Sequence, residues 1–290
     1  MTRDWISIAA VGTLTVIWGS AFALTGVALE GFSPAAIAAG RTWLSAGAVL
    51  CLTWALGQSL PRRWDHWAWC AGLGALSLAI PFFLLAWAQQ TVPSAVAAIF
   101  ISCVPLFVLL LSRLILGEAV SPLRWLGFVV GLAGILWLIG PAALPGLLEG
   151  GGWPQLALLG AALCYGSSAI LIRVMPPIPP VEATAAAQIA ASVLLLPVGI
   201  AAWPGVWPMG APLIALAVLG LVQTGVAQLL RYYTVRRAGP VFVSVVGYLI
   251  PIWAGILGVV LLSEPLTWRM ISAFAIILVG LVLAQRRGPA

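Results

Sequence analysis

Charged residues are scarce in this chain. They make up 7% of its 290 residues, whereas about a quarter of residues carry charge in soluble globular domains, and 63% of the chain is hydrophobic. Lysine is absent, so all 13 basic residues are arginine, and only seven residues are acidic. This composition excludes a soluble globular domain and predicts an integral membrane protein.

Residues that build metal sites, disulfides and hydrolytic centres are also rare. The only histidine, His66, lies in a predicted connection, and the four cysteines fall inside predicted spans without CxxC spacing. No zinc site and no disulfide framework is therefore expected. A serine nucleophile in Gly166-Ser167-Ser168 would need a histidine or a carboxylate beside it, and the interior of the predicted spans, away from their ends, holds neither. We expect no enzyme activity, no metal and no cofactor.

Acidic residues are missing from the predicted membrane interior. All seven lie at or beyond span ends, although proton-coupled carriers usually hold an ionisable group within the membrane. The one candidate is Arg41, about 10 Å along its predicted helix, and its side chain could snorkel outward. We therefore expect a small neutral or zwitterionic substrate that moves down its gradient, or is coupled in a way that the sequence does not reveal.

Stretches without charge give the number of spans. Backbone polar groups must be paired in hydrocarbon, so each span is expected to be a helix of about 20 apolar residues. Six stretches fit one helix each, and the 47-residue and 48-residue stretches fit two each. The sequence thus predicts an all-α membrane protein with ten transmembrane helices, at 5–28, 34–56, 67–88, 94–115, 122–140, 153–173, 181–202, 211–234, 240–262 and 267–285.

The second half of the chain repeats the first. Pro105 lies inside an apolar helix that ends near Glu118, and the same pair recurs 146 residues later as Pro251 and Glu264. Internal repeats of this length in a membrane chain are typical of secondary transporters, whose substrate path lies between the two copies.

An odd number of helices per repeat inverts the second copy. With five helices each, residues 1–141 and 153–290 are expected to begin on opposite sides of the membrane and to form one compact domain around a central cavity. Because each helix crosses the membrane, successive connections lie on alternate sides. This assignment places eleven arginines on the side of both termini and Arg269 alone on the other side. By the positive-inside rule, both termini are cytoplasmic. Charge confined to one membrane side also argues against nucleic-acid binding.

Repeat symmetry selects candidate substrate-binding residues. The substrate site of such transporters lies where the repeats meet near the bilayer midplane, so polar or aromatic residues at matched positions are expected to line the cavity. The serines among them are equally compatible with helix–helix contacts, whereas the two glutamines favour a hydrated cavity. The predicted substrate-binding residues are Trp18, Ser77, Phe82, Ser102, Tyr165, Gln223, Gln228, Ser244 and Tyr248.

Three prolines interrupt predicted helices. Pro81, Pro105 and Pro251 each free a backbone carbonyl that a ligand or a neighbouring helix can use. They are predicted to act as hinges or gating positions, with a static kink as the alternative. Glu118 and Glu264 shortly precede the next helices, where a carboxylate suits a positive helix N-terminus, so a structural role is expected for both.

Together these features resemble the drug/metabolite transporter superfamily, in its EamA-like branch. The resemblance covers essentially the whole chain, and it implies a central cavity formed by helices 1, 3, 4, 6, 8 and 9 and export of metabolites from the cytoplasm. The chain departs from the small multidrug members in lacking a membrane-embedded glutamate. Besides the ten helices in two copies, the resemblance rests on Trp18-Gly19-Ser20, Arg41 in a proline-led helix, Leu116-Gly117-Glu118 and Ser263-Glu264-Pro265.

Within that branch, the chain looks most like bacterial exporters of aromatic and other neutral amino acids. The aromatic residues of the predicted wall suit ring-bearing substrates. We expect a multi-pass transporter of the bacterial cytoplasmic (inner) membrane, whose partners are the lipid bilayer and a small-molecule substrate, most of all an amino acid, exported by alternating access. A lipid or lipid-linked sugar flippase, or an exporter of other small metabolites, is the alternative. The sequence carries no signal for an oligomeric state.

Overall fold

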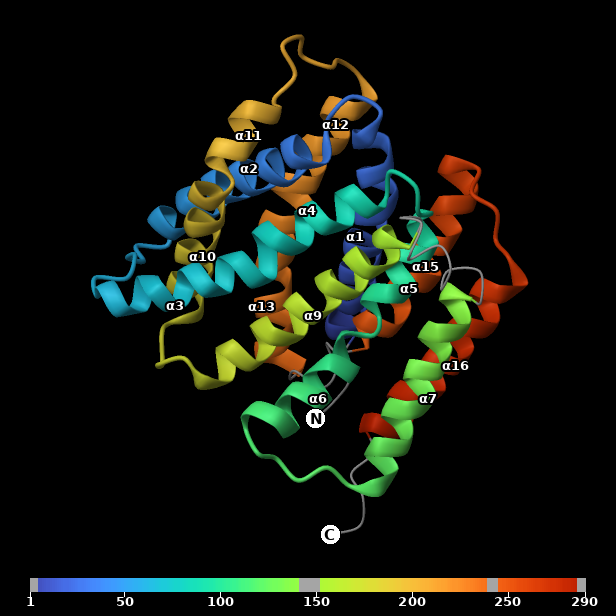
Figure 1. Cartoon of the computed structure of the whole chain (residues 1–290). Helices are drawn as coiled ribbons and strands as arrows, with labels where there is room; N and C mark the ends of the chain where they lie inside the picture. The colour runs from blue at the N-terminus through green and yellow to red at the C-terminus, as the bar shows by residue number, and fades with distance from the viewer. Residues whose placement is uncertain (1–4, 141–151, 239–244, 286–290) are drawn as a thin grey trace.

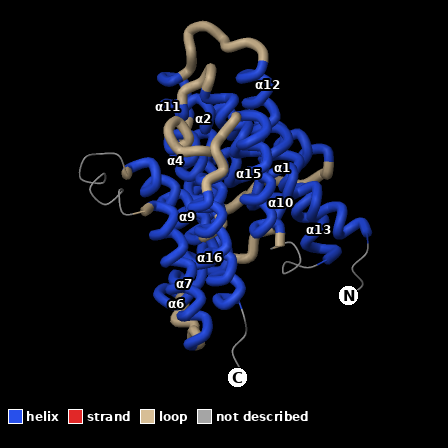
Figure 2. The backbone as a smooth tube through the Cα atoms, turned by 90° about the vertical axis from the view of Figure 1, so that its right-hand side faces the viewer, coloured by secondary structure: helices blue, strands red, loops and turns tan. Residues whose placement is uncertain are grey.

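The chain folds as a bundle of helices. The computed structural model describes residues 5–140, 152–238 and 245–285, and every regular element in these ranges is helical (Figures 1 and 2). The helices of the first half are α1 (Trp5–Leu29), α2 (Pro34–Ala55), α3 (Trp64–Gly74), η1 (Ala75–Ala79), α4 (Ile80–Ala88), α5 (Ser94–Ile101), α6 (Val104–Ile115) and α7 (Pro122–Ile139). Those of the second half are α9 (Trp153–Val174), α10 (Pro180–Leu194), α11 (Leu196–Ala202), α12 (Ala211–Val218), η2 (Leu219–Val226), α13 (Ala227–Ala238), α15 (Val246–Leu262) and α16 (Trp268–Gln285).

These helices confirm an all-helical membrane protein. Among the described residues, seven helices are long and apolar enough to cross a membrane, and the pair α10 and α11, bent by 50°, gives an eighth if it forms one span. Two shorter apolar helices, Ala211–Val226 and Val246–Leu262, complete the set. A total of ten spans therefore requires that both shorter helices also cross the bilayer.

The two halves share unusual backbone features at positions 146 residues apart. The π-helical segment η1 corresponds to positions 221–225, which lie within the π-helical segment η2. Left-handed residues follow the helix ends at Gly117 (φ 69°) and Ser263 (φ 53°), which are also 146 apart. After each, the glutamate N–H donates to the carbonyl six residues earlier, at 3.2 Å for Glu118 and 3.0 Å for Glu264. Backbone geometry thus repeats together with the sequence.

The three prolines predicted as hinges occupy different settings. Pro81 lies in the first turn of α4, directly after η1, and Pro105 lies in the first turn of α6, after a break between α5 and α6. Proline removes an N–H from the helix ladder, which accounts for irregular turns at these two points. Pro251 instead lies inside α15, which continues through it.

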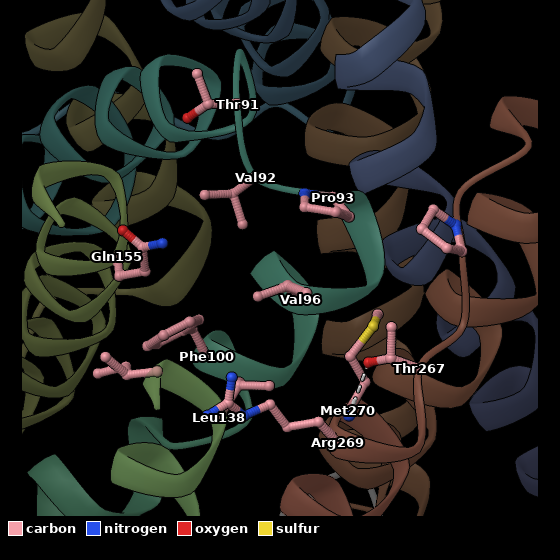
Figure 3. Close-up of a pocket in the computed structure, with 12 residues that line it drawn as sticks. Thr91, Val92, Pro93, Val96, Phe100, Leu138, Gln155, Thr267, Arg269 and Met270 are labelled. Atoms are coloured by element: carbon pink, nitrogen blue, oxygen red, sulfur yellow. Dashed lines mark hydrogen bonds between the residues drawn. The ribbon is translucent and has the colours of Figure 1, made fainter. Parts of the chain in front are cut away.

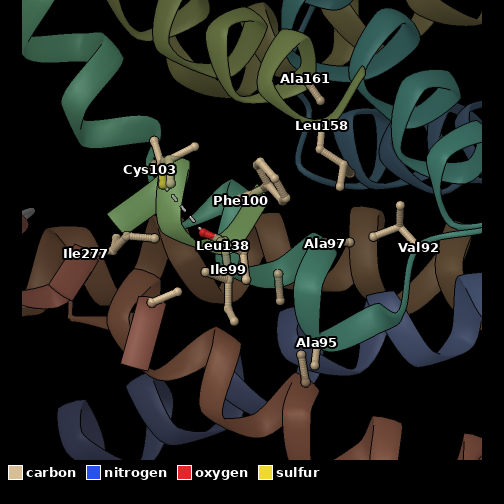
Figure 4. Close-up of a cluster of buried hydrophobic side chains, with 14 of the residues drawn as sticks. Val92, Ala95, Ala97, Ile99, Phe100, Cys103, Leu138, Leu158, Ala161 and Ile277 are labelled. Carbon is tan, nitrogen blue, oxygen red and sulfur yellow. Dashed lines mark hydrogen bonds between the residues drawn. The ribbon is translucent and has the colours of Figure 1, made fainter. Parts of the chain in front are cut away.

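Small residues allow the helices to pack closely. The largest hydrophobic cluster surrounds α5, where Ala97 and Phe100 are fully buried and pack with Leu158 of α9 and Ile277 of α16 (Figure 4). Helices α7 and α16 lie side by side (Figure 1). A Cβ atom on Gly280 of α16 would lie 2.4 Å from the backbone nitrogen of Gly131 in α7. The close approach of these two helices therefore requires glycine at position 280. Such contacts are typical of helices that associate in lipid.

Candidate functional site

An arginine reaches into the helix bundle. Arg41 does not snorkel away from the interior: its Nε atom donates to the Thr224 hydroxyl of η2 at 2.8 Å. Its Cζ atom lies 3.8 Å from the ring centre of Phe82 in α4, a cation–π contact. The guanidinium is thus held by helices of both halves, among aromatic and hydroxyl side chains.

The π-helical geometry of η2 positions the threonine that holds this arginine. The Thr224 hydroxyl donates to the Leu219 carbonyl five residues earlier at 2.9 Å, which leaves its oxygen free to accept from Arg41. Helix α2 can pack closely against η2 because residue 220 of η2 is glycine. A Cβ atom there would lie 2.5 Å from the Leu44 Cβ atom of α2. The contact therefore depends on a helix irregularity, and π-helical turns are frequent at functional sites.

Three residues of the predicted wall supply further polar groups. The Trp18 indole of α1 donates to the backbone carbonyl of Gln223 in η2 at 3.1 Å. The Gln223 side chain is 3% exposed, and within the described part of the chain neither its Oε1 atom nor the Tyr248 hydroxyl has a hydrogen-bond partner. A buried polar atom without a partner costs about 1–3 kcal/mol, so water or a ligand that binds either atom is stabilised.

The predicted serines bond to their own helices. The Ser77 hydroxyl donates to the carbonyl four residues earlier at 2.5 Å, and the Ser102 hydroxyl donates to the carbonyl three residues earlier at 2.7 Å. Hydroxyl groups often satisfy themselves in this way within helices, so these two serines offer no unpaired donor to a ligand. Ser244 and the side chain of Gln228 lie outside the described residues.

Selection by repeat symmetry misses Arg41 and Thr224. It favours positions that are polar or aromatic in both halves, with Ser244 opposite Ala98 as the exception. The residues 146 positions away from Arg41 and Thr224 are Ala187 and Leu78. Arg41 can still be recognised from the sequence, because it is the only charged residue well inside a predicted span. Thr224 carries no comparable signal, since membrane helices contain many threonines that only bond to their own backbone.

The two glutamates contact elements other than those expected. Both were expected to face the N-terminus of the next helix, but Glu264 instead accepts from the backbone N–H groups of Ser94 (2.7 Å) and Ala95 (3.4 Å) at the start of α5. Glu118 forms an ion pair with Arg173 of α9 at 2.5 Å. The left-handed turn before each glutamate redirects the chain, so the carboxylate reaches a neighbouring helix before the next helix begins.

A cavity of about 270 Å³ lies at one end of the bundle. The connection between α4 and α5, the end of α7 and the starts of α9 and α16 surround it (Figure 3). None of the predicted wall residues lines it, and its polar side chains are Thr91, Gln155, Thr267 and Arg269. Candidate binding groups therefore occur in two places, around Arg41 and in this end cavity.

Comparison with known protein families places the chain among membrane transporters. The EamA-like transporter family matches residues 5–140 and matches again over residues 152–285. The chain belongs to the EamA-like transporter family. Members of this family are transporters and not enzymes, and the double match gives this EamA-like chain one family unit in each half.

Relatives of this EamA-like protein extend over nearly its whole length. The uncharacterized inner membrane transporter YedA of Escherichia coli K12 is 30% identical, over 94% of this chain and 90% of its own. The aromatic amino acid exporter YddG of Ancylobacter novellus is 26% identical, over 96% of each chain. A probable terminal-alkyne amino-acid exporter of Streptantibioticus cattleyicolor is 27% identical, over 94% and 92%. One solved crystal structure, 23% identical, shares the fold with a TM-score of 0.67 over 98% of both chains.

Proposed function

We propose that this EamA-like transporter exports amino acids, including aromatic ones, and similar small zwitterionic metabolites by alternating access. The observation that carries the proposal is Arg41, a permanent cation held inside the bundle. Among the described residues its one hydrogen bond runs from Nε to Thr224, and no carboxylate pairs with it. Its two terminal amino groups are therefore available to bind the carboxylate of a substrate.

The surroundings of Arg41 suit the rest of an amino acid. Phe82 offers an aromatic face beside the guanidinium, against which a substrate ring can stack. Tyr165 of α9, which packs against the hydrophobic cluster around α5, is the second aromatic contact that we propose for the substrate. The unpartnered Oε1 atom of Gln223, the residue before Thr224, is an acceptor for a substrate ammonium group. Tyr248 of α15, whose hydroxyl is also buried without a partner in the described structure, is a further polar contact that we propose for the substrate. Trp18 holds the Gln223 backbone in place. Two relatives carry amino acid exporter in their names, which supports the same substrate class.

The transport cycle that we propose uses the repeat. Ten spans form two inverted repeats, residues 1–141 and 153–290, in the bacterial inner membrane with both termini in the cytoplasm, and Pro81, Pro105 and Pro251 act as hinges. The outer end is tied together by the Gln89 amide, which donates to the Phe22 carbonyl at 2.9 Å, and by the contact of Glu264 with α5. These contacts must open for the substrate to leave.

Counterflow in proteoliposomes tests this proposal. Purified protein is reconstituted with unlabelled amino acid inside, and entry of labelled Phe, Trp, Thr and Met is followed. Loss of a charge-assisted contact costs about 1.5–3 kcal/mol, so Arg41→Leu is expected to lower transport roughly 10-fold to 100-fold. Arg41→Lys keeps the charge and is expected to retain part of the activity.

The matched control is Arg62→Gln, which removes an exposed arginine from a connection. Normal transport by Arg41→Leu would remove the proposed carboxylate site. Scrambling of a fluorescent lipid without counterflow of any amino acid would replace the proposal with a flippase. Repeating the assay with and without a pH gradient tests the expected independence from protons, which a strict requirement for the gradient would contradict.

A further inference from the structure

We propose that the end cavity is a second binding site, for a small group that carries a primary ammonium and an anionic oxygen. The inference rests on the proposed function for one of its two possible occupants, a free amino acid leaving the transporter. The other source of the same chemistry is the headgroup of phosphatidylethanolamine. The site is formed by residues of both halves and is separate from the groups around Arg41.

Arg269 provides the cationic side of this site. Its Nε atom donates to the Trp137 carbonyl at 2.9 Å, and its Cζ atom lies 5.6 Å from the Trp137 ring centre. The guanidinium also fills the space where a Cβ atom of residue 140 would stand, so only glycine fits there. These contacts fix the arginine at the cavity wall (Figure 3), and no acidic residue in the described ranges pairs with it. Its terminal amino groups can bind an anionic oxygen.

Gln155 provides the complementary acceptor. It enters the cavity from the first turn of α9, and its Oε1 atom is buried without a hydrogen-bond partner in the described structure (Figure 3). An unpartnered buried carbonyl oxygen is satisfied best by a strong donor, and a primary ammonium supplies up to three N–H groups. A choline headgroup has no N–H donor and cannot make this bond.

The remaining walls select for size and polarity. Val92, Val96, Phe100, Leu138 and Met270 make most of the lining apolar, which suits the side chain of a neutral amino acid or the upper part of a lipid. The volume of about 270 Å³ lies just below the roughly 300–1,000 Å³ of pockets that hold drug-sized ligands. The cavity therefore fits a molecule of the size of an amino acid or a lipid headgroup.

Equilibrium binding in lipid nanodiscs tests the site. With phosphatidylcholine as the only zwitterionic lipid, labelled phenylalanine is expected to bind wild-type protein at two sites. Gln155→Leu is expected to weaken one of them about 10-fold, since a hydrogen bond to a charged group is lost, and to leave the other unchanged. Arg269→Gln is expected to weaken phenylalanine binding at the same site as Gln155→Leu, and Arg41→Leu is expected to weaken binding at the other site. Gln58→Leu and Arg62→Gln, both in an exposed connection, are the matched controls.

A second arm identifies the occupant. If phosphatidylethanolamine displaces phenylalanine from the site that depends on Gln155, and mass spectrometry finds this lipid bound to wild-type protein but not to Gln155→Leu, the lipid headgroup is the natural occupant. If added lipid has no effect, the occupant is the free amino acid.

Two results separate this inference from the proposed function. Single-site binding that neither Gln155→Leu nor Arg269→Gln changes, with normal counterflow and no retained lipid, would overturn the end site and leave the export proposal intact. Absence of counterflow together with lipid binding that depends on Gln155 would overturn the export proposal and keep the site. Because Arg269 also bonds to the Trp137 backbone, a misfolded Arg269→Gln variant leaves Gln155→Leu to decide.

Discussion

The two π-helical segments occupy equivalent positions in the two halves but differ in what their side chains do. In η1, Ser77 bonds to its own helix, whereas in η2, Thr224 bonds to Arg41 from another helix. The matched turns differ likewise, since Glu118 pairs with an arginine and Glu264 caps α5. The repeat therefore preserves backbone irregularities, while the polar contacts that join separate helices have diverged.

Removing the hydroxyl group of Ser77 in η1 and of Thr224 in η2 tests this difference most strongly. Thr224→Val keeps the shape of the side chain but leaves the Nε atom of Arg41 without its acceptor, so transport is expected to fall about 10-fold. Ser77→Ala removes a bond within one helix and is expected to change transport less than about two-fold, since such local bonds contribute little. Counterflow rates, normalised to the amount of folded protein, measure both. Equal losses would mean that the two segments act alike.

Neutralising the two glutamates compares a helix cap with an ion pair. Glu264→Gln weakens the interaction with the start of α5 and is expected to lower the free energy of unfolding by about 1–2 kcal/mol. Glu118→Gln breaks an ion pair whose side chains are 37% and 49% exposed, so about 0–1 kcal/mol is expected. Denaturant titration followed by tryptophan fluorescence measures both changes. A larger effect at Glu118 would reverse this order.

Replacing the two left-handed residues is expected to give small effects on stability, with opposite signs. Ser263→Gly removes the Cβ atom from a residue with left-handed backbone angles, and glycine adopts positive φ without steric cost. The substitution is therefore expected to stabilise the protein by about 0.5–1 kcal/mol. Gly117→Ala places a Cβ atom at φ 69° and should destabilise by about 1–2 kcal/mol, although no other atom lies within 4 Å to clash with it. The same titration tests the signs, and a stabilising Gly117→Ala would contradict this account.

Much of the fold could be predicted from the sequence. Most helices begin and end within a few residues of the expected ranges, because each span must be continuously apolar and is bounded by charge, proline or glycine. The expected start at residue 240 lies outside the described residues, and the expected helix 94–115 is divided into α5 and α6. The π-helical segments could not be predicted, since η2 forms without a proline and has no sequence pattern that separates it from an ordinary helix. The direction of the Arg41 side chain could not be predicted either, because it is set by contacts with Thr224 and Phe82 on other helices.

The sequence by itself determined that this is a duplicated helical membrane protein, because hydropathy and repeats are properties of the chain. It also located the one charge deep in a predicted span. Only the tertiary structure decided which groups meet: Arg41 with Thr224, Glu264 with α5, and Gln155 with Arg269 at one cavity. These pairs lie on helices far apart in the sequence, and their contacts depend on helix rotation and close packing at glycine, which no local pattern specifies.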